Sequence, residues 1–127
     1  MMQLPQALVG LFDAENRRDW EGLAALLHPD VEWTVTPSRR GRTVGIDAYL
    51  ERLEESYRES GEAVFKIRRI VRGDDALTAT ELVDQAGNIS LEVFELDNGL
   101  VRRAWSYLFE APITEPPDSD LLVPTPA

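Results

Sequence analysis

Three side chains in the second half of the chain, Asp84, Glu92 and Tyr107, are of types that exchange protons with a substrate. Two carboxyl groups that share an apolar cavity acquire different pKa values, so that one acts as a base and the other as an acid. A tyrosine hydroxyl can donate a hydrogen bond to a developing oxyanion. The three groups therefore suit acid–base chemistry, provided that the fold brings them to one cavity.

Each of these residues also has a purely structural interpretation. Asp84 lies beside a turn signal, and aspartate in turns often bonds its own backbone. Glu92 would be solvated near the rim of a sheet, and Tyr107 could pack as a core aromatic whose hydroxyl finds a partner. The residue types alone leave both interpretations open.

The amino-acid composition excludes some kinds of catalytic chemistry and disfavours some kinds of partner. The 127 residues include no cysteine and one histidine, which excludes thiol nucleophiles and multi-histidine metal sites. We therefore expect neither a metal nor a cofactor. The 13 basic and 23 acidic residues give a net charge of −10, which disfavours nucleic acid and anionic membranes as partners.

The sequence also lacks the signals of export and membrane insertion. No apolar run approaches the roughly 20 residues of a membrane span. The first residues lack the basic region and the cleavage site of a signal peptide. We therefore expect a cytoplasmic protein.

The first half of the chain shows helical periodicity. Apolar residues at helical spacing predict a helix over 4–16 and another over 46–60. A second helix between them is capped by Asp19 and ended by His28-Pro29. A short strand follows at 31–37, and residues 38–45 form a polar loop.

The second half changes to the periodicity of strands. Short turn signals join the strands, which must therefore be antiparallel, and Arg69 indicates a bulge. The four predicted strands are 63–72, 76–84, 88–97 and 100–110. The order predicts an α+β fold with helices on one face of a curved sheet. We expect a single domain over 1–111 and a proline-rich tail over 112–127.

Strand alternation shows which side chains share a face. On the last strand, Arg103, Trp105, Tyr107 and Phe109 share one face, and its bulky aromatics indicate that it points inward. On the strand before, Glu92 shares its face with Phe94. On strand 76–84 alternation does not choose between the two faces.

One sheet face is rather apolar for contact with solvent. It carries Leu77, Ala79, Val83, Ile89, Leu91 and Val93. Such a face often becomes a dimer interface, so we expect a homodimer formed through the outer face of the sheet.

The order of elements and three local strings resemble the nuclear transport factor 2-like superfamily, including its SnoaL-like branch. The strings are LAALLHPDVEW at 23–33, GRTVGIDAYL at 41–50 and LEVFELDNGLVRRAWSYLFE at 91–110. The resemblance implies three helices wrapped by a strongly curved sheet that encloses an apolar pocket. The superfamily holds isomerases, cyclases, dehydratases, epoxide hydrolases and non-catalytic binding proteins, so the fold does not settle the function.

The nearest enzymatic resemblance is to limonene epoxide hydrolase, which uses an Asp–Arg–Asp set. The resemblance implies that Asp84 matches one carboxylate and that Leu82 replaces the arginine. Tyr107 stands at the second aspartate, and Trp33 and Val35 stand where that family holds a water molecule. One of the five positions is therefore kept.

A resemblance to ketosteroid isomerase concerns a different position. It implies that Glu92 takes the place of that family's oxyanion-hole carboxyl group, which stays protonated in an apolar site. Neighbouring side chains such as Phe94 and Trp105 would supply such a site.

We predict a cofactor-free acid–base enzyme that acts on a small apolar molecule by isomerisation, cyclisation, dehydration or epoxide hydrolysis. Its candidate catalytic residues are Asp84, Glu92 and Tyr107. Its candidate substrate-binding residues are Trp33, Val35, Leu82, Phe94, Arg103, Trp105 and Phe109. The alternative is a non-catalytic ligand-binding or dimerisation protein of the same fold.

Overall fold

The computed structural model describes residues 4–36, 41–59, 61, 63–74 and 76–108. Two sequence predictions lie outside these residues: the inward position of Phe109 and the tail at 112–127.

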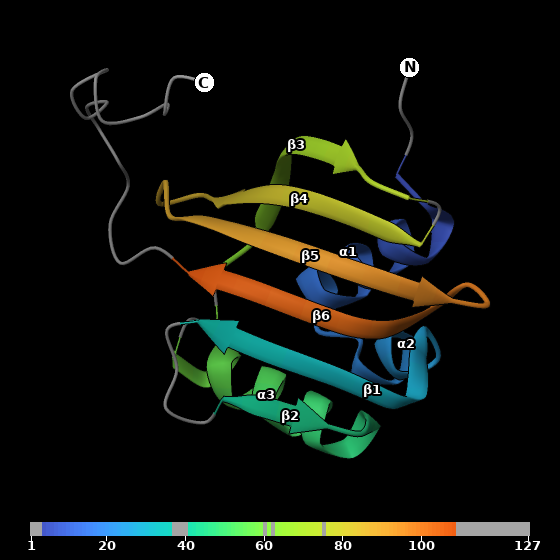
Figure 1. Cartoon of the computed structure of the whole chain (residues 1–127). Helices are drawn as coiled ribbons and strands as arrows, with labels where there is room; N and C mark the ends of the chain where they lie inside the picture. The colour runs from blue at the N-terminus through green and yellow to red at the C-terminus, as the bar shows by residue number, and fades with distance from the viewer. Residues whose placement is uncertain (1–3, 37–40, 60, 62, 75, 109–127) are drawn as a thin grey trace, which may run out of the picture.

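Three helices lie on one side of a six-stranded sheet (Figure 1). The helices are α1 Gln6–Arg17, α2 Trp20–Ala24 and α3 Ile46–Glu59. The strands are β1 Leu27–Thr36, β2 Arg42–Val44, β3 Phe65–Arg72, β4 Leu77–Asp84, β5 Ile89–Asp97 and β6 Leu100–Leu108. The sheet order is β2-β1-β6-β5-β4-β3; β1 and β6 run parallel and the other neighbours antiparallel. The predicted α+β class is confirmed.

Several local predictions are also confirmed. Asp19 caps α2, since its Oδ1 accepts a hydrogen bond from the Gly22 amide at 3.0 Å. The pairing of β3 with β4 shifts between Ile67 and Arg69, as expected for a bulge. Asn98 turns β5 into β6 with a positive φ of 52°, which this side chain tolerates better than most.

Two predictions about the first half of the chain are wrong. The second helix ends at Ala24, and His28-Pro29 lies within β1, because Leu27 already pairs with Val101 of β6. Residues 42–44 of the predicted loop form the edge strand β2. Three residues are too few to show an alternation, so tertiary pairing with β1 alone makes this strand visible.

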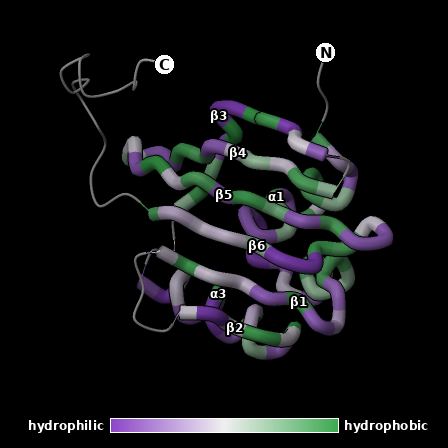
Figure 2. The backbone as a smooth tube through the Cα atoms, viewed as in Figure 1, coloured by the Kyte–Doolittle hydropathy of each residue, from purple (hydrophilic) through white to green (hydrophobic). Residues whose placement is uncertain are grey.

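The core lies between the helices and the inner face of the sheet. Leu8, Leu11 and Phe12 of α1 are buried, and the ring of Phe12 meets that of Phe94 edge to face at 5.5 Å. The edge strand β3 carries basic residues interleaved with apolar ones (Figure 2), and charge on an edge strand discourages pairing with another chain.

The predicted facing of β6 is wrong. Ala104 and Ser106 are buried, whereas Tyr107 is 39% exposed on the outer face. Ala104 lies between Trp33 of β1 and Phe94 of β5, and both of these large side chains point inward. At Ala104 and Ser106 the inner side of β6 therefore has room only for small residues, and Trp105 and Tyr107 cover the outside of the sheet.

None of the described helices is long and apolar enough to cross a membrane.

Packing of α1 predicts a contrast between two adjacent residues. Leu8 is 0% exposed and Val9 is 48% exposed. The substitution Leu8→Ala should lower the free energy of unfolding by about 2–5 kcal/mol, because it leaves a cavity in the core. Val9→Ala should change it by about 0.5 kcal/mol or less. Urea denaturation measures both, and equal effects would contradict the described packing.

Candidate functional site

A cavity of about 600 Å³ lies between α1, α3 and the inner face of the sheet. Its apolar lining includes Trp33, Val35, Leu53, Phe65, Leu82 and Leu108. Its carboxyl groups are those of Glu15, Glu55, Glu59, Asp84 and Glu92, beside the guanidinium of Arg52. The lining is therefore apolar and acidic together.

Glu92 projects from β5 into the cavity and is held by a chain of hydrogen bonds. It pairs in register with Ser106 of β6, whose hydroxyl donates a short hydrogen bond to Glu92 Oε2. The same hydroxyl accepts a hydrogen bond from Trp33 Nε1 at 2.8 Å. The indole thus orients the serine, and the serine orients the carboxyl group.

Burial raises the pKa of Glu92 from 4.5 to about 8. The hydroxyls of Ser106 and Ser90 lower it, and the nearby Glu15 carboxylate raises it. Among the described residues, the Ser90 hydroxyl is buried without a well-formed hydrogen bond of its own. Glu92 is consequently protonated at neutral pH and can donate a proton into the cavity.

Glu15 brings a second carboxyl group to the same cavity from α1. Burial raises its pKa from 4.5 to about 7, while the charge of Arg18 and a hydrogen bond from the Tyr57 hydroxyl lower it. Glu15 therefore ionises more readily than Glu92.

Arg18 fixes this corner of the site. It ends α1 with a left-handed φ of 60°, and its guanidinium lies 3.7 Å from the centre of the Tyr57 ring. Its Nη2 donates to the carbonyl oxygens of Gly61 at 2.9 Å and Ala63 at 2.7 Å. One side chain thereby ties α1 to α3 and to the segment that leads into β3.

Two tyrosines of α3 stay neutral around the carboxyl groups. Burial raises the pKa of Tyr49 and of Tyr57, and the charges of Glu15 and Glu92 raise both further. Tyr49 is also stacked on Trp33, with ring centres 4.6 Å apart. Both phenols therefore remain hydrogen-bond donors at neutral pH.

Asp84 reaches the rim of the cavity, but its carboxylate serves the β4–β5 turn. It accepts hydrogen bonds from the amides of Ala86 at 2.9 Å and Asn88 at 2.8 Å and from Asn88 Nδ2 at 2.9 Å. Desolvation opposes their effect, yet together the turn's hydrogen bonds lower the pKa of Asp84. An ionised, exposed carboxylate of this kind fits the structural interpretation.

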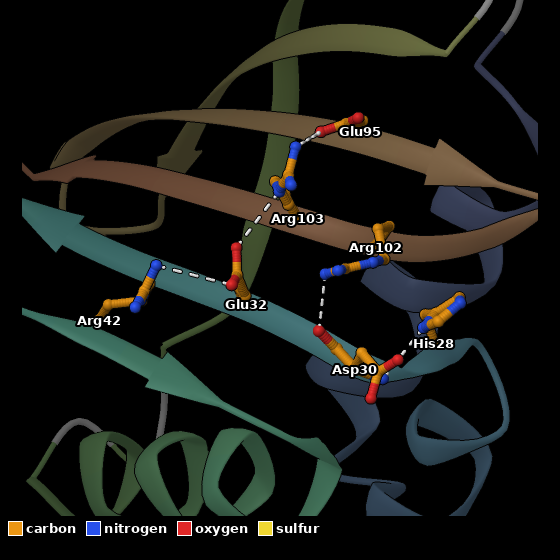
Figure 3. A network of polar contacts seen from close by, with 7 residues as sticks. All are labelled: His28, Asp30, Glu32, Arg42, Glu95, Arg102 and Arg103. Carbon is orange, nitrogen blue, oxygen red and sulfur yellow. Dashed lines mark hydrogen bonds and ion pairs between the residues drawn. The ribbon is translucent and has the colours of Figure 1, made fainter.

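The structure separates Tyr107, Arg103 and Trp105 from the cavity, so their predicted inward positions are wrong. Arg103 lies on the outer face, where its Nε meets Glu32 at 3.2 Å and its Nη1 meets Glu95 at 3.1 Å (Figure 3). Trp105 borders a separate outer hollow of about 370 Å³.

The remaining candidates divide between the cavity and the core. Trp33, Val35 and Leu82 line the cavity as expected. Phe94 is buried but packs against Phe12 in the core behind it.

Sequence reasoning missed Glu15 and Ser106. Glu15 follows Leu8, Leu11 and Phe12 at the spacing of the apolar face of α1, so a charged residue on a buried stripe was the available signal. Ser106 carried no signal of its own, because the facing of β6 was misassigned.

Within the described ranges, no group of three or more histidine, cysteine, aspartate or glutamate residues is arranged to hold a metal ion.

The chain belongs to the SnoaL-like domain family, whose sequence pattern matches residues 8–104. A candidate ketosteroid isomerase from Kribbella flavida is 27% identical, with a TM-score of 0.72 over 97% of this chain and 90% of that one. An epoxide hydrolase from M. tuberculosis similar to limonene epoxide hydrolase is 24% identical, with a TM-score of 0.64 over 83% of this chain and 81% of that one. TerC, crystallised with polyporic acid, is 18% identical, with a TM-score of 0.68 over 82% and 89%. The similarity to the M. tuberculosis protein and to TerC shows only that the fold is shared. No curated protein matches significantly.

The raised pKa of Glu92 predicts how stability depends on pH. Glu92 ionises near 4.5 when unfolded and near 8 when folded, so the unfolded state binds fewer protons between these values. Its contribution to the free energy of unfolding is full below pH 4.5 and is lost as the pH rises through about 8.

The substitution Glu92→Gln should remove this loss. Urea denaturation at about pH 5 and about pH 8 should show the variant gaining stability relative to the wild type at the higher pH. Glu81→Gln, on β4 beside Arg69 on the outer face, is the matched control and should show no such gain. Parallel behaviour of wild type and Glu92→Gln would mean that Glu92 is not perturbed.

Proposed function

We propose that the protein is a cofactor-free acid–base enzyme in which Glu92 acts as the acid on a small, uncharged, largely apolar molecule. The observation that carries this proposal is the setting of Glu92: a carboxyl group in a cavity wall, raised in pKa by burial and touched by hydroxyls rather than by a cation. Such a group is costly in a binding pocket, and it suits the transfer of a proton to a substrate oxygen.

The cavity supports a small neutral ligand. Its volume of about 600 Å³ is within the range of small-molecule sites. Among the described residues, the lining carboxyl groups outnumber the guanidinium of Arg52, so an anionic substrate would be repelled. Trp33 and Leu82 offer apolar contact surface for the body of the molecule.

The similar proteins support the same type of step. The names of the K. flavida and M. tuberculosis proteins denote a ketosteroid isomerase and an epoxide hydrolase. Both reactions need a hydrogen-bond donor or acid at an oxygen of an uncharged substrate. Cyclisation and dehydration can use the same step, so Glu92 would serve any of the four predicted reactions.

Turnover of two probes tests the proposal. A steroid β,γ-unsaturated ketone and an apolar epoxide represent the two reactions. If the wild type converts either one, Glu92→Gln should lower kcat by about 100-fold or more, because the group that protonates the oxygen is gone.

Glu81→Gln makes the same chemical change outside the cavity and should keep full activity. Full activity of Glu92→Gln would contradict the proposal. Tight binding of both probes without conversion would favour the alternative of a non-catalytic binding protein.

We also propose that the outer face of the sheet joins two copies of the chain. An apolar row crosses four strands in register, through Val71, Ala79, Val93 and Trp105. Ion pairs flank it: Arg69 meets Glu81 on one side, and Arg103 meets Glu32 and Glu95 on the other. Arg42 also meets Glu32, at 3.6 Å, so among the described residues of this face three guanidiniums pair with three carboxylates despite the net charge of −10. A two-fold axis would let the row pack against itself.

Sedimentation velocity tests the dimer. The wild type should sediment with twice the chain mass of 14.3 kDa, and Val93→Lys should sediment as a monomer, because a charge enters the centre of the row. The same substitution at the exposed Val9 of α1 is the control and should leave the dimer intact. A monomeric wild type at micromolar concentration would contradict the proposal.

A further inference from the structure

A second carboxyl group, that of the half-buried Glu15, lines the cavity and has no role in the proposed function. Glu15 extends the buried face of α1 two turns after Leu8, where an apolar side chain would cost less free energy to bury. Its hydrogen bond from Tyr57 and the nearby charge of Arg18 favour its ionised form. The site thus contains two carboxyl groups of different character facing one space.

The difference between the two carboxyl groups has a visible cause. Glu15 lies near Arg18, whose guanidinium is fixed over the Tyr57 ring at 3.7 Å. The groups that act on Glu92 are hydroxyls and Glu15 itself. Of two neighbouring carboxyl groups, the one beside the cation ionises first.

The electrostatic coupling between the two groups is mutual, and it shows in the pKa of the group that ionises second. The charge of Glu15 raises the pKa of Glu92, whereas the pKa of Glu15 is set by burial, by Arg18 and by Tyr57. This pattern describes a pair in which Glu15 ionises while Glu92 still holds its proton.

We propose that Glu15 is the base that complements Glu92, so that the two glutamates move one proton off the substrate and another onto it. This inference rests on the proposed function and assigns its missing partner. In a ketone substrate, Glu15 would remove a proton from the carbon next to the carbonyl group. The electron pair of the broken C–H bond would form a C=C bond. The π electrons of the carbonyl group would move onto its oxygen, which would take the proton of Glu92, so that an enol forms.

The proton balance of this step closes within the site. Glu15 gains the proton that the carbon loses, and Glu92 loses the proton that the oxygen gains. When Glu15 returns its proton to another carbon of the enol, the oxygen's proton returns to Glu92. Both groups are then restored, so isomerisation needs no further reactant.

Arg18 and Tyr57 are positioning residues in this scheme, since both act through Glu15. Other charged or titratable groups that line the cavity are Arg52, Glu55 and Glu59 from α3 and Asp84 from β4, and Tyr49 of α3 lies buried behind Trp33. The raised pKa values of the tyrosines keep them neutral, and the lowered pKa of Asp84 keeps it ionised. We therefore expect Glu15 and Glu92 to be the pair that changes state near neutral pH.

Carboxyl-carbon NMR titration of the full chain tests the pair without a substrate. Glu15→Gln should lower the pKa of Glu92 from about 8, because a negative charge that raises it is removed. Glu92→Gln should leave the pKa of Glu15 near 7, because Glu92 is neutral when Glu15 ionises. Glu51→Gln, on the exposed side of α3, is the control and should move neither titration. Should Glu15→Gln not fold, Glu15→Leu continues the apolar face of α1 and replaces it.

An unchanged Glu92 titration in Glu15→Gln would overturn the inference, as would a large change of Glu15 in Glu92→Gln. Activity on the steroid β,γ-unsaturated ketone separates this inference from the proposed function. A kcat lowered by about 100-fold in Glu15→Gln and in Glu92→Gln supports both the proposed function and the role of Glu15 as the base. Loss in Glu92→Gln alone would overturn the role of Glu15 and keep the acid, and loss in neither would overturn both.

Discussion

The site depends on one constraint: the Glu92 carboxyl group lies where its charged form is poorly solvated. Burial raises the pKa of this group. The hydrogen bonds from Trp33 to Ser106 and from Ser106 to Glu92 fix its orientation without bringing a positive charge to it. A cation in contact with Glu92 would have made it a permanent carboxylate. The fold instead places Arg18 near Glu15, at another point of the cavity wall, so that the two carboxyl groups of one cavity differ in pKa.

Local signals of the sequence were enough for most of the fold. The helical spacing of apolar residues predicts α1 and α3, and the capping residue Asp19 predicts the start of α2. Arg69, at a position where alternation calls for an apolar residue, predicts the bulge in β3. The failures came from tertiary pairing. Leu27 leaves its predicted helix to pair with Val101, and no periodicity of the sequence reports such a contact between distant segments.

The site was harder to predict because alternation assigns two faces but does not say which is inner. Glu92 was placed correctly, whereas Tyr107 was placed inward on the strength of its bulk. The inner side of β6 is in fact filled from its neighbours, since Trp33 and Phe94 flank Ala104 and leave no room for another aromatic ring. Volume in a core is shared among strands, so one strand's composition does not decide its facing.

Difference infrared spectroscopy at neutral pH tests the central claim most directly, because a protonated carboxyl group has a carbonyl stretching band that a carboxylate lacks. The spectrum of the wild type minus that of Glu92→Gln should contain this band, and raising the pH through about 8 should convert it to carboxylate bands. A carboxylate signal from Glu92 already present at pH 6 to 7 would contradict the account, since Glu92 would then be an ordinary solvated acid.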